Sequence, residues 1–238
     1  MTLNNNQEYM VLDKELLEQC FKDLAKSLRK SSKIANVNCE LVVVGGASIL
    51  LNYGFRKTTS DVDCTDEHKI LMNDVINNIA IKYGLPNTWI NTDFINSKSY
   101  SPKLIQYSDY YRSYSNGALV VRTIKDEYLL AMKVVSGRKY KNDYSDIYGI
   151  ITFKNKDEQI ITNSILDKAI VELYGSLDYT DKEALDFAHF IIDNPESIPY
   201  EEIKKMEEKN ANILKVKKAD AKDKADIEYV LSKLEIMN

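Results

Sequence analysis

Residues 42–64 are VVVGGASILLNYGFRKTTSDVDC, a segment in which several structural signals follow one another. Leu41 to Val44 form a short, mainly β-branched run of the kind found in buried strands. Gly45 and Gly46 then turn the chain, and ASILLN continues directly as a helix. Asp61 to Cys64 alternate acidic and apolar side chains, which is typical of a short strand with one buried face. The segment therefore predicts a strand, a glycine turn, a helix and a second strand.

Two features of this segment suit a phosphate and a divalent cation. Glycines let the backbone approach a ligand closely, and free N–H groups at the start of a helix attract an anion, so Gly45, Gly46 and Ser48 are candidate phosphate-binding residues. Asp61 and Asp63 share one face of their strand, with Cα atoms about 6–7 Å apart. Both carboxylates can then bind one or two divalent ions. The alternatives are a plain turn and a strand with two solvated acids.

Helical patterns flank the segment on both sides. Apolar side chains recur at intervals of three and four over residues 11–32, with Asp13 placed to cap the helix. Residues 66–83 repeat the pattern and stop at Gly84, a conventional C-terminal signal. Both segments are therefore expected to be amphipathic helices.

The next hundred residues add β-structure and more helix. Residues 88–95, TWINTDFI, are short and β-prone, and Trp89 is expected in the core. Two strands are expected around the pair Asn116-Gly117, a strong hairpin signal. Asp126 is placed to cap a helix, and another helix is expected to begin near Asn142 or Asp143.

Only helical patterns follow from about residue 157 onward. The chain is therefore expected to have an α+β part, residues 1–155, and a helical C-terminal region, residues 156–238, which includes a helix in KADIEYVLSKLEIM.

Composition limits the chemistry. The 238 residues carry a net charge of −4, which does not indicate general nucleic-acid binding. Three cysteines without CxxC spacing argue against a disulfide framework and favour a reducing cytoplasm. With two histidines, any metal is expected to be a hard ion held by carboxylates. No apolar run approaches the roughly 18 residues of a membrane span, and we expect a cytoplasmic protein without membrane contact.

The strand, Gly-Gly turn, helix and later Asp-x-Asp together resemble the nucleotidyltransferase superfamily that includes polymerase β. Within it, residues 45–63, GGASILLNYGFRKTTSDVD, are most similar to bacterial nucleotidyltransferases allied to AbiEii, the toxin component of abortive-infection and toxin–antitoxin systems. The resemblance implies a mixed sheet flanked by helices in residues 1–155. It also implies that Asp61 and Asp63 hold Mg²⁺.

A second block, residues 129–150, resembles a later part of the same family, with a helical lysine, a basic stretch and acids that open the next helix. The residues that match this block are Lys133, Arg138, Asp143 and Asp146. The resemblance implies that Lys133 binds phosphate oxygens, and that Asp143 or Asp146 orients this lysine or activates the acceptor. An amphipathic helix and ordinary first-turn acids are the alternative.

The implied reaction moves a nucleoside monophosphate from a nucleoside triphosphate to a hydroxyl of tRNA, protein or a small molecule, with a cognate antitoxin as a possible partner. Arg56 is expected to bind a phosphate or the acceptor, or else to pair with Asp61 or Asp66. Candidates for a third metal carboxylate are Asp93 and Asp109.

Two alternatives to this reading differ in what they require. The first is a catalytically inactive member of the fold that binds a nucleotide or a partner. The second is an aminoglycoside-modifying enzyme, for which the acceptor cleft should be acidic, whereas a basic surface around the Asp pair would favour RNA.

Overall fold

A three-stranded mixed sheet forms the centre of the chain in the computed structural model, which describes residues 11–30, 39–65, 69–153, 160–195 and 197–216. Strand β5 (Leu119–Ile124) lies in the middle of the sheet. It pairs in parallel with β1 (Cys39–Val43) and antiparallel with β4 (Ser108–Tyr114). The fold is mixed α+β, as the sequence predicts.

A short parallel pair, β2 (Val62–Asp63) and β3 (Ile90–Asn91), forms a separate two-stranded sheet beside the end of β1. An antiparallel bridge joins Val43 to Cys64, and the Val44 amide donates to the Asp63 carbonyl at 2.9 Å. The second strand of the motif is therefore fixed directly beside the end of the first.

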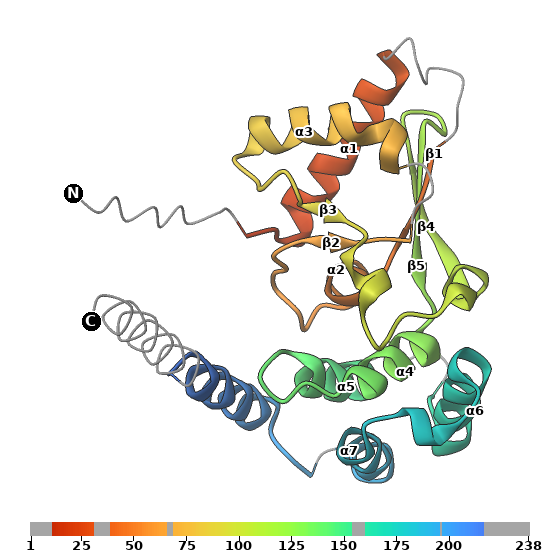
Figure 1. Cartoon of the computed structure of the whole chain (residues 1–238), viewed down its shortest axis with the longest axis vertical. Helices are drawn as coiled ribbons and strands as arrows, with labels where there is room; N and C mark the ends of the chain where they lie inside the picture. The colour runs from red at the N-terminus through yellow and green to blue at the C-terminus, as the bar shows by residue number, and fades with distance from the viewer. Residues whose placement is uncertain (1–10, 31–38, 66–68, 154–159, 196, 217–238) are drawn as a thin grey trace, which may run out of the picture.

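Helices cover the sheet and continue beyond it (Figure 1). Helices α1 (Lys14–Lys30) and α3 (Lys69–Tyr83) lie together on one side, and α2 (Gly45–Asn52) follows β1. The remaining helices gather near the other end of the sheet: α4 (Asp126–Ser136), α5 (Asp143–Thr152), α6 (Asn163–Tyr174), α7 (Lys182–Asp193) and a helix over residues 200–216. Short 3₁₀ helices are η1 (Asp93–Asn96), η2 (Pro102–Tyr107) and η3 (Leu177–Tyr179).

Alternating side chains of β1 separate two apolar clusters. Leu41 and Val43 face a cluster shared with α1 and α3, whereas Val42 and Val44 face one shared with α2, α4, α5, α6 and α7. This alternation is what the pleat of a strand covered on both faces requires. The second cluster contains side chains from both sides of residue 155.

Most of the expected elements are confirmed. Asp13 caps α1, since its Oδ1 accepts from the Leu16 amide at 2.8 Å. Trp89 is fully buried, and its ring N–H donates to the Ile76 carbonyl at 3.1 Å. The hairpin turns with positive φ angles at Ser115, Asn116 and Gly117.

Two expectations about local structure are wrong or too broad. Asp126 does not cap α4: Lys125 is the N-cap residue, and Asp126 accepts a hydrogen bond from the Tyr53 hydroxyl instead. Residues 88–95 form only the two-residue strand β3 followed by η1. The helix expected in KADIEYVLSKLEIM lies outside the described residues. Among those described, no helix is long and apolar enough to cross a bilayer.

Candidate active site

A cavity of about 580 Å³ opens where the motif strands end. Its walls come from four places: the start of α2, the Arg56–Asp63 segment, β3 with η1, and the end of α4 with the loop into α5. The charged side chains in its lining are Arg56, Lys133, Arg138, Lys141, Asp61, Asp63, Asp93 and Asp143. Most site residues expected from the sequence are therefore brought into one space.

The two glycines allow the walls to approach each other. Gly45 has a φ angle of +60°, and a Cβ built on it would lie 3.4 Å from Oδ2 of Asp63. A Cβ on Gly46 would lie 2.7 Å from Nη2 of Arg56 and 3.2 Å from the Thr59 hydroxyl. The first position needs a residue that tolerates a left-handed backbone, and the second leaves no space for a side chain.

Asp61 and Asp63 flank the buried Val62, so both carboxylates lie on the cavity side of β2. Burial raises the pKa of Asp63 to about 6, and the nearby charges of Asp61 and Asp93 act in the same direction. Lys133 and Arg138 lower it, but they do not offset the other effects. This acidic wall is therefore short of positive charge.

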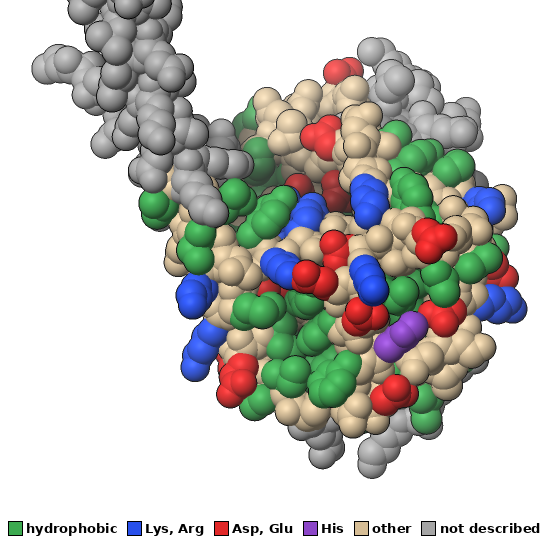
Figure 2. Space-filling view, turned by 60° about the horizontal axis from the view of Figure 1, so that its bottom comes forward, with side chains coloured by type: hydrophobic (Ala, Val, Ile, Leu, Met, Phe, Trp, Pro, Cys, Tyr) green, Lys and Arg blue, Asp and Glu red, His purple; other side chains and the backbone are tan. Residues whose placement is uncertain are grey.

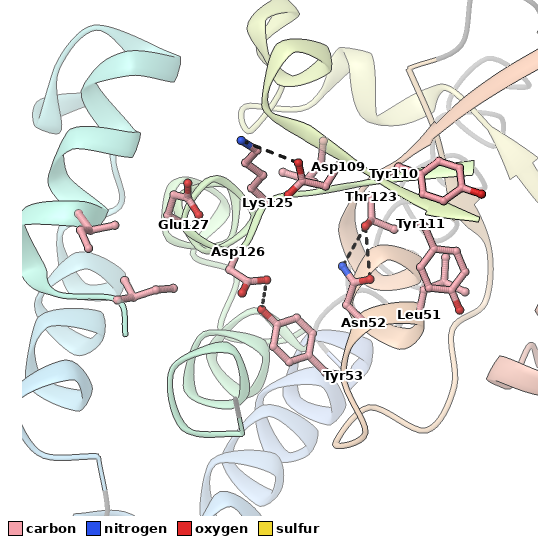
Figure 3. A pocket seen from close by; sticks show the side chains of 13 residues that line it. Leu51, Asn52, Tyr53, Asp109, Tyr110, Tyr111, Thr123, Lys125, Asp126 and Glu127 are labelled. Carbon is pink, nitrogen blue, oxygen red and sulfur yellow. Dashed lines mark hydrogen bonds and ion pairs between the residues drawn. The ribbon is translucent and has the colours of Figure 1, made fainter. Parts of the chain in front are cut away.

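Of the two candidates for a third carboxylate, only Asp93 lies in this cavity. Its amide donates to Oδ1 of Asn91 at 2.9 Å, which fixes the turn that follows β3. Asp109 lies in a second cavity of about 560 Å³ at the opposite end of α2, where it pairs with Lys125 at 3.8 Å (Figure 3). The two cavities have no lining residue in common.

Lys133 is the centre of a chain of ion pairs on the opposite wall. Its Nζ lies 3.1 Å from Asp143 Oδ1 and 2.8 Å from Asp146 Oδ2. Asp143 also accepts from Nε of Arg138 at 2.8 Å. Asp146 accepts from Nη1 of Arg56 at 2.9 and 2.7 Å. Three cations thus alternate with two carboxylates.

These contacts fix the protonation states of the buried groups. Burial alone would lower the pKa of Lys133, but Asp146 and Asp143 outweigh it, and the pKa lies above its usual value. Burial would raise the pKa of Asp143, but Lys133 and Arg138 bring it well below its usual range. The lysine therefore stays cationic, and Asp143 stays an anion whose oxygens already accept hydrogen bonds.

Two of the expected nucleotide-binding residues, Arg56 and Ser48, are not free to bind a ligand in the way the sequence predicts. Arg56 lines the cavity but pairs with Asp146, 90 residues away in sequence, and Asp66 lies outside the described residues. Ser48 is fully buried within α2, and its hydroxyl does not line the cavity. Of the three residues expected in the turn, Gly45 and Gly46 line the cavity.

The acidic wall fits a hard divalent cation. Among the described residues, no three His, Cys, Asp or Glu side chains are close enough to form a complete metal site. Mg²⁺ does not require one, because proteins commonly bind it through one or two carboxylates and the phosphates of the substrate. Asp61 and Asp63 supply carboxylates of this kind, and a cation beside them would offset the like charges of Asp61 and Asp93 that, after burial, raise the pKa of Asp63.

Sequence reasoning missed several lining residues. Asn91, Ser97 and Ser99 face the cavity from the β3 side, and Tyr140 and Lys141 from the loop before α5. The basic stretch Arg138 to Lys141 was a visible signal for the latter two. No local pattern points to the others, because they reach the cavity only through the fold.

A strand, a Gly-Gly turn, a helix and an Asp-x-Asp pair on the adjacent strand, facing a lysine from a later helix, define a nucleotidyltransferase-like site. Residues 15–207 match the family described as nucleotidyltransferase of unknown function (DUF6036), and the chain belongs to this family. No curated protein and no solved structure matches the chain. The closer resemblance to AbiEii-type proteins stays a prediction.

Proposed function

We propose that the chain is a magnesium-dependent nucleotidyltransferase that transfers a nucleoside monophosphate from a nucleoside triphosphate to a hydroxyl group. The observation that carries this proposal is the single cavity shared by the Gly45-Gly46 turn, the Asp61 and Asp63 carboxylates, and Lys133. Membership of a nucleotidyltransferase family supports the same reaction class. The Asp-x-Asp wall and the Lys133 wall supply the opposite charges that a metal–triphosphate complex needs.

Each residue has a role that follows from its position. Asp61 and Asp63 hold Mg²⁺, which supplies charge neutralisation at the phosphates. The backbone of Gly45 and Gly46 admits the triphosphate, and Lys133 binds a phosphate oxygen as a point charge. Asp143 is a positioning residue for Lys133, because its oxygens are occupied by Lys133 and Arg138.

In the reaction, the acceptor oxygen forms a bond to the α-phosphorus and the bond from that phosphorus to pyrophosphate breaks. The acceptor proton passes to water in the open cavity. The side chains act mainly by holding the two reactants in line and by stabilising charge.

The acceptor is a hydroxyl of tRNA, of a protein or of a small molecule, and a cognate antitoxin would fit a toxin–antitoxin setting. The cavity lining has four basic and four acidic side chains, so its charge favours neither a polycation nor RNA. On the face seen in Figure 2, acidic and basic side chains are likewise interspersed. A cytoplasmic location is consistent with Cys20, Cys39 and Cys64, which form no disulfide with one another.

Calorimetric titration with each nucleoside triphosphate, with and without Mg²⁺, tests the proposal. We expect Mg²⁺-dependent binding that is lost in an Asp61→Ala, Asp63→Ala double variant. The matched control is Asp109→Ala, which removes a carboxylate from the other cavity and should bind normally. If wild-type protein bound no triphosphate, the proposal would be overturned.

A second assay separates the enzyme from an inactive relative. Pyrophosphate release in the presence of candidate acceptors reports transfer itself. Tight, Mg²⁺-dependent nucleotide binding without any release, across RNA, protein and small-molecule acceptors, would favour the nucleotide-binding alternative.

A further inference from the structure

We propose that Glu207, on the 200–216 helix, is a positioning residue of the candidate active site that caps α5 and so holds Asp143 and Asp146 in place for nucleotide binding. The inference rests on the proposed function, since it assumes that the cavity binds a nucleoside triphosphate. Glu207 itself does not line the cavity.

The start of α5 is not capped by its own N-cap residue. Asn142 occupies that position but makes no capping hydrogen bond with its side chain. Its Oδ1 accepts from Nζ of Lys204 at 2.7 Å. The Ser145 amide, which an N-cap side chain would ordinarily bind, donates to Oε1 of Glu207 at 2.9 Å. A carboxylate from another helix therefore replaces the local cap.

The location of Glu207 is costly for stability. The residue is 2% exposed, and its buried Oε2 has no hydrogen-bond partner in the part of the chain that the structure describes. Lys204 lies 3.9 Å from that oxygen, and Asp146 lies near enough to oppose its negative charge. A buried carboxyl group with one unsatisfied oxygen costs stability that an apolar side chain would not. Glu207 is nevertheless placed at the N-terminus of α5, which is the positive end of the helix dipole. We therefore attribute its position to the arrangement of the active site rather than to stability.

The first turn of α5 controls the cationic wall. Asp143 holds Lys133 and Arg138, and Asp146 holds Lys133 and Arg56. Asp143 is the first residue of α5, and the Asp146 amide donates the first hydrogen bond within the helix, to the Asn142 carbonyl at 2.8 Å. If this turn loosens, the three cations lose their common support.

The 200–216 helix also contacts the two chain segments beside this turn. Nδ2 of Asn210 donates to the Lys139 carbonyl at 3.1 Å, in the loop that contains Arg138. The Tyr200 ring packs against Phe55, with centroids 6.0 Å apart, next to Arg56. In sequence, Glu207 therefore lies between two other residues of this helix, Tyr200 and Asn210, that contact segments next to site residues.

The test compares Glu207→Ala with Glu207→Gln, which keeps an acceptor for the Ser145 amide. Glu208→Ala is the matched control, because Glu208 is the adjacent residue on the same helix and is exposed. Hydrogen exchange of residues 138–146, without nucleotide, reports the cap. We expect exchange about fivefold faster in Glu207→Ala, corresponding to the ordinary cost of losing a cap. Glu207→Gln and Glu208→Ala should exchange like the wild type.

Calorimetric titration with the triphosphate and Mg²⁺, below the unfolding temperature of every variant, reports the positioning role. We expect weaker binding in Glu207→Ala, restored in Glu207→Gln. Faster exchange with wild-type affinity would overturn the positioning role, because Glu207 would then serve stability alone. If the folded Glu207→Ala variant exchanged at the wild-type rate, Glu207 would not be the capping residue of α5. If the wild type itself bound no triphosphate, both the proposed function and the positioning role of Glu207 would be overturned. If the wild type bound normally and Glu207→Ala bound equally well, only the positioning role would be overturned.

Discussion

Lys133 and Asp146 form a buried ion pair between α4 and α5, with 2.8 Å between Nζ and Oδ2. The side chains are 9% and 2% exposed, so solvent screens the pair very little. The same Nζ contacts Asp143, and each carboxylate has a second partner, an arginine. Lys133 therefore has two roles, one in holding α4 against α5 and one in facing the cavity.

Replacing Lys133 by Met should weaken both stability and nucleotide binding. Two buried carboxylates would lose a shared cation, and breaking a buried pair typically costs about 3 kcal/mol in the free energy of unfolding. Urea denaturation measures that loss, and titration at low denaturant measures affinity. Lys139→Met is the control, since Lys139 pairs with the exposed Glu183. It should change stability by less than about 1 kcal/mol. Equal effects of the two variants would contradict the assignment.

Gly46→Ala should disturb the site through Arg56. The new methyl group would lie 2.7 Å from Nη2, so the guanidinium must move and its bond to Asp146 must weaken. We expect reduced triphosphate affinity in Gly46→Ala and a strongly non-additive double variant with Arg56→Ala, because the two substitutions remove the same contact. Additive losses would show that Gly46 acts instead through the backbone of the turn.

The stability of the fold should depend on pH through Glu207. Burial raises its pKa to about 7 from the ordinary 4.5, although hydrogen bonds from Ser145 and the charge of Lys204 oppose the rise. Between these values the folded state keeps a proton that the unfolded state has released. The free energy of unfolding should therefore fall as pH rises from about 4.5 to about 7, by up to about 3 kcal/mol.

Glu207→Gln should remove this part of the pH dependence and be more stable than the wild type at pH 8. Urea unfolding of both proteins between pH 5 and 8 measures the difference. Subtracting the two profiles cancels other groups that titrate in this window, Asp63 among them. Parallel profiles would show that Glu207 is ionised throughout.

The local parts of the site could be predicted from the sequence. A glycine turn, the spacing of Asp61 and Asp63, and the acids that open α5 are all properties of neighbouring residues. The structure brings the turn, the Asp pair and Asp143 to one cavity. Asp126 shows the limit of local reasoning. Its side chain is the right type at the right end of a helix, but the Tyr53 hydroxyl from another part of the chain binds it instead.

The supporting contacts could not be predicted, because they join distant segments. Arg56 and Asp146 are separated by 90 residues, and Glu207 and Ser145 by 62. A carboxylate in a lysine-rich amphipathic helix gives no sign that it is buried. The Asn142 side chain at the start of α5 accepts from Lys204 and makes no cap hydrogen bond of its own.

Gly149→Ala should show how closely α5 is packed against the segment that carries Arg56. A Cβ on Gly149 would lie 2.3 Å from the Phe55 ring, which is too close for any contact without movement. Phe55 also packs on Phe153 and Tyr200, so the ring cannot shift freely. We expect a loss of about 1–3 kcal/mol in the free energy of unfolding, typical of overpacking, and weaker nucleotide binding because Arg56 follows Phe55.

Thermal unfolding and titration measure these effects, and Phe55→Leu in the same chain should relieve part of the loss by making room for the methyl group. Gly54→Ala, whose new methyl group meets no atom of the described residues within 4 Å, is the control and should unfold like the wild type. A Gly149→Ala protein of normal stability would mean that α5 and Phe55 are not in the contact described.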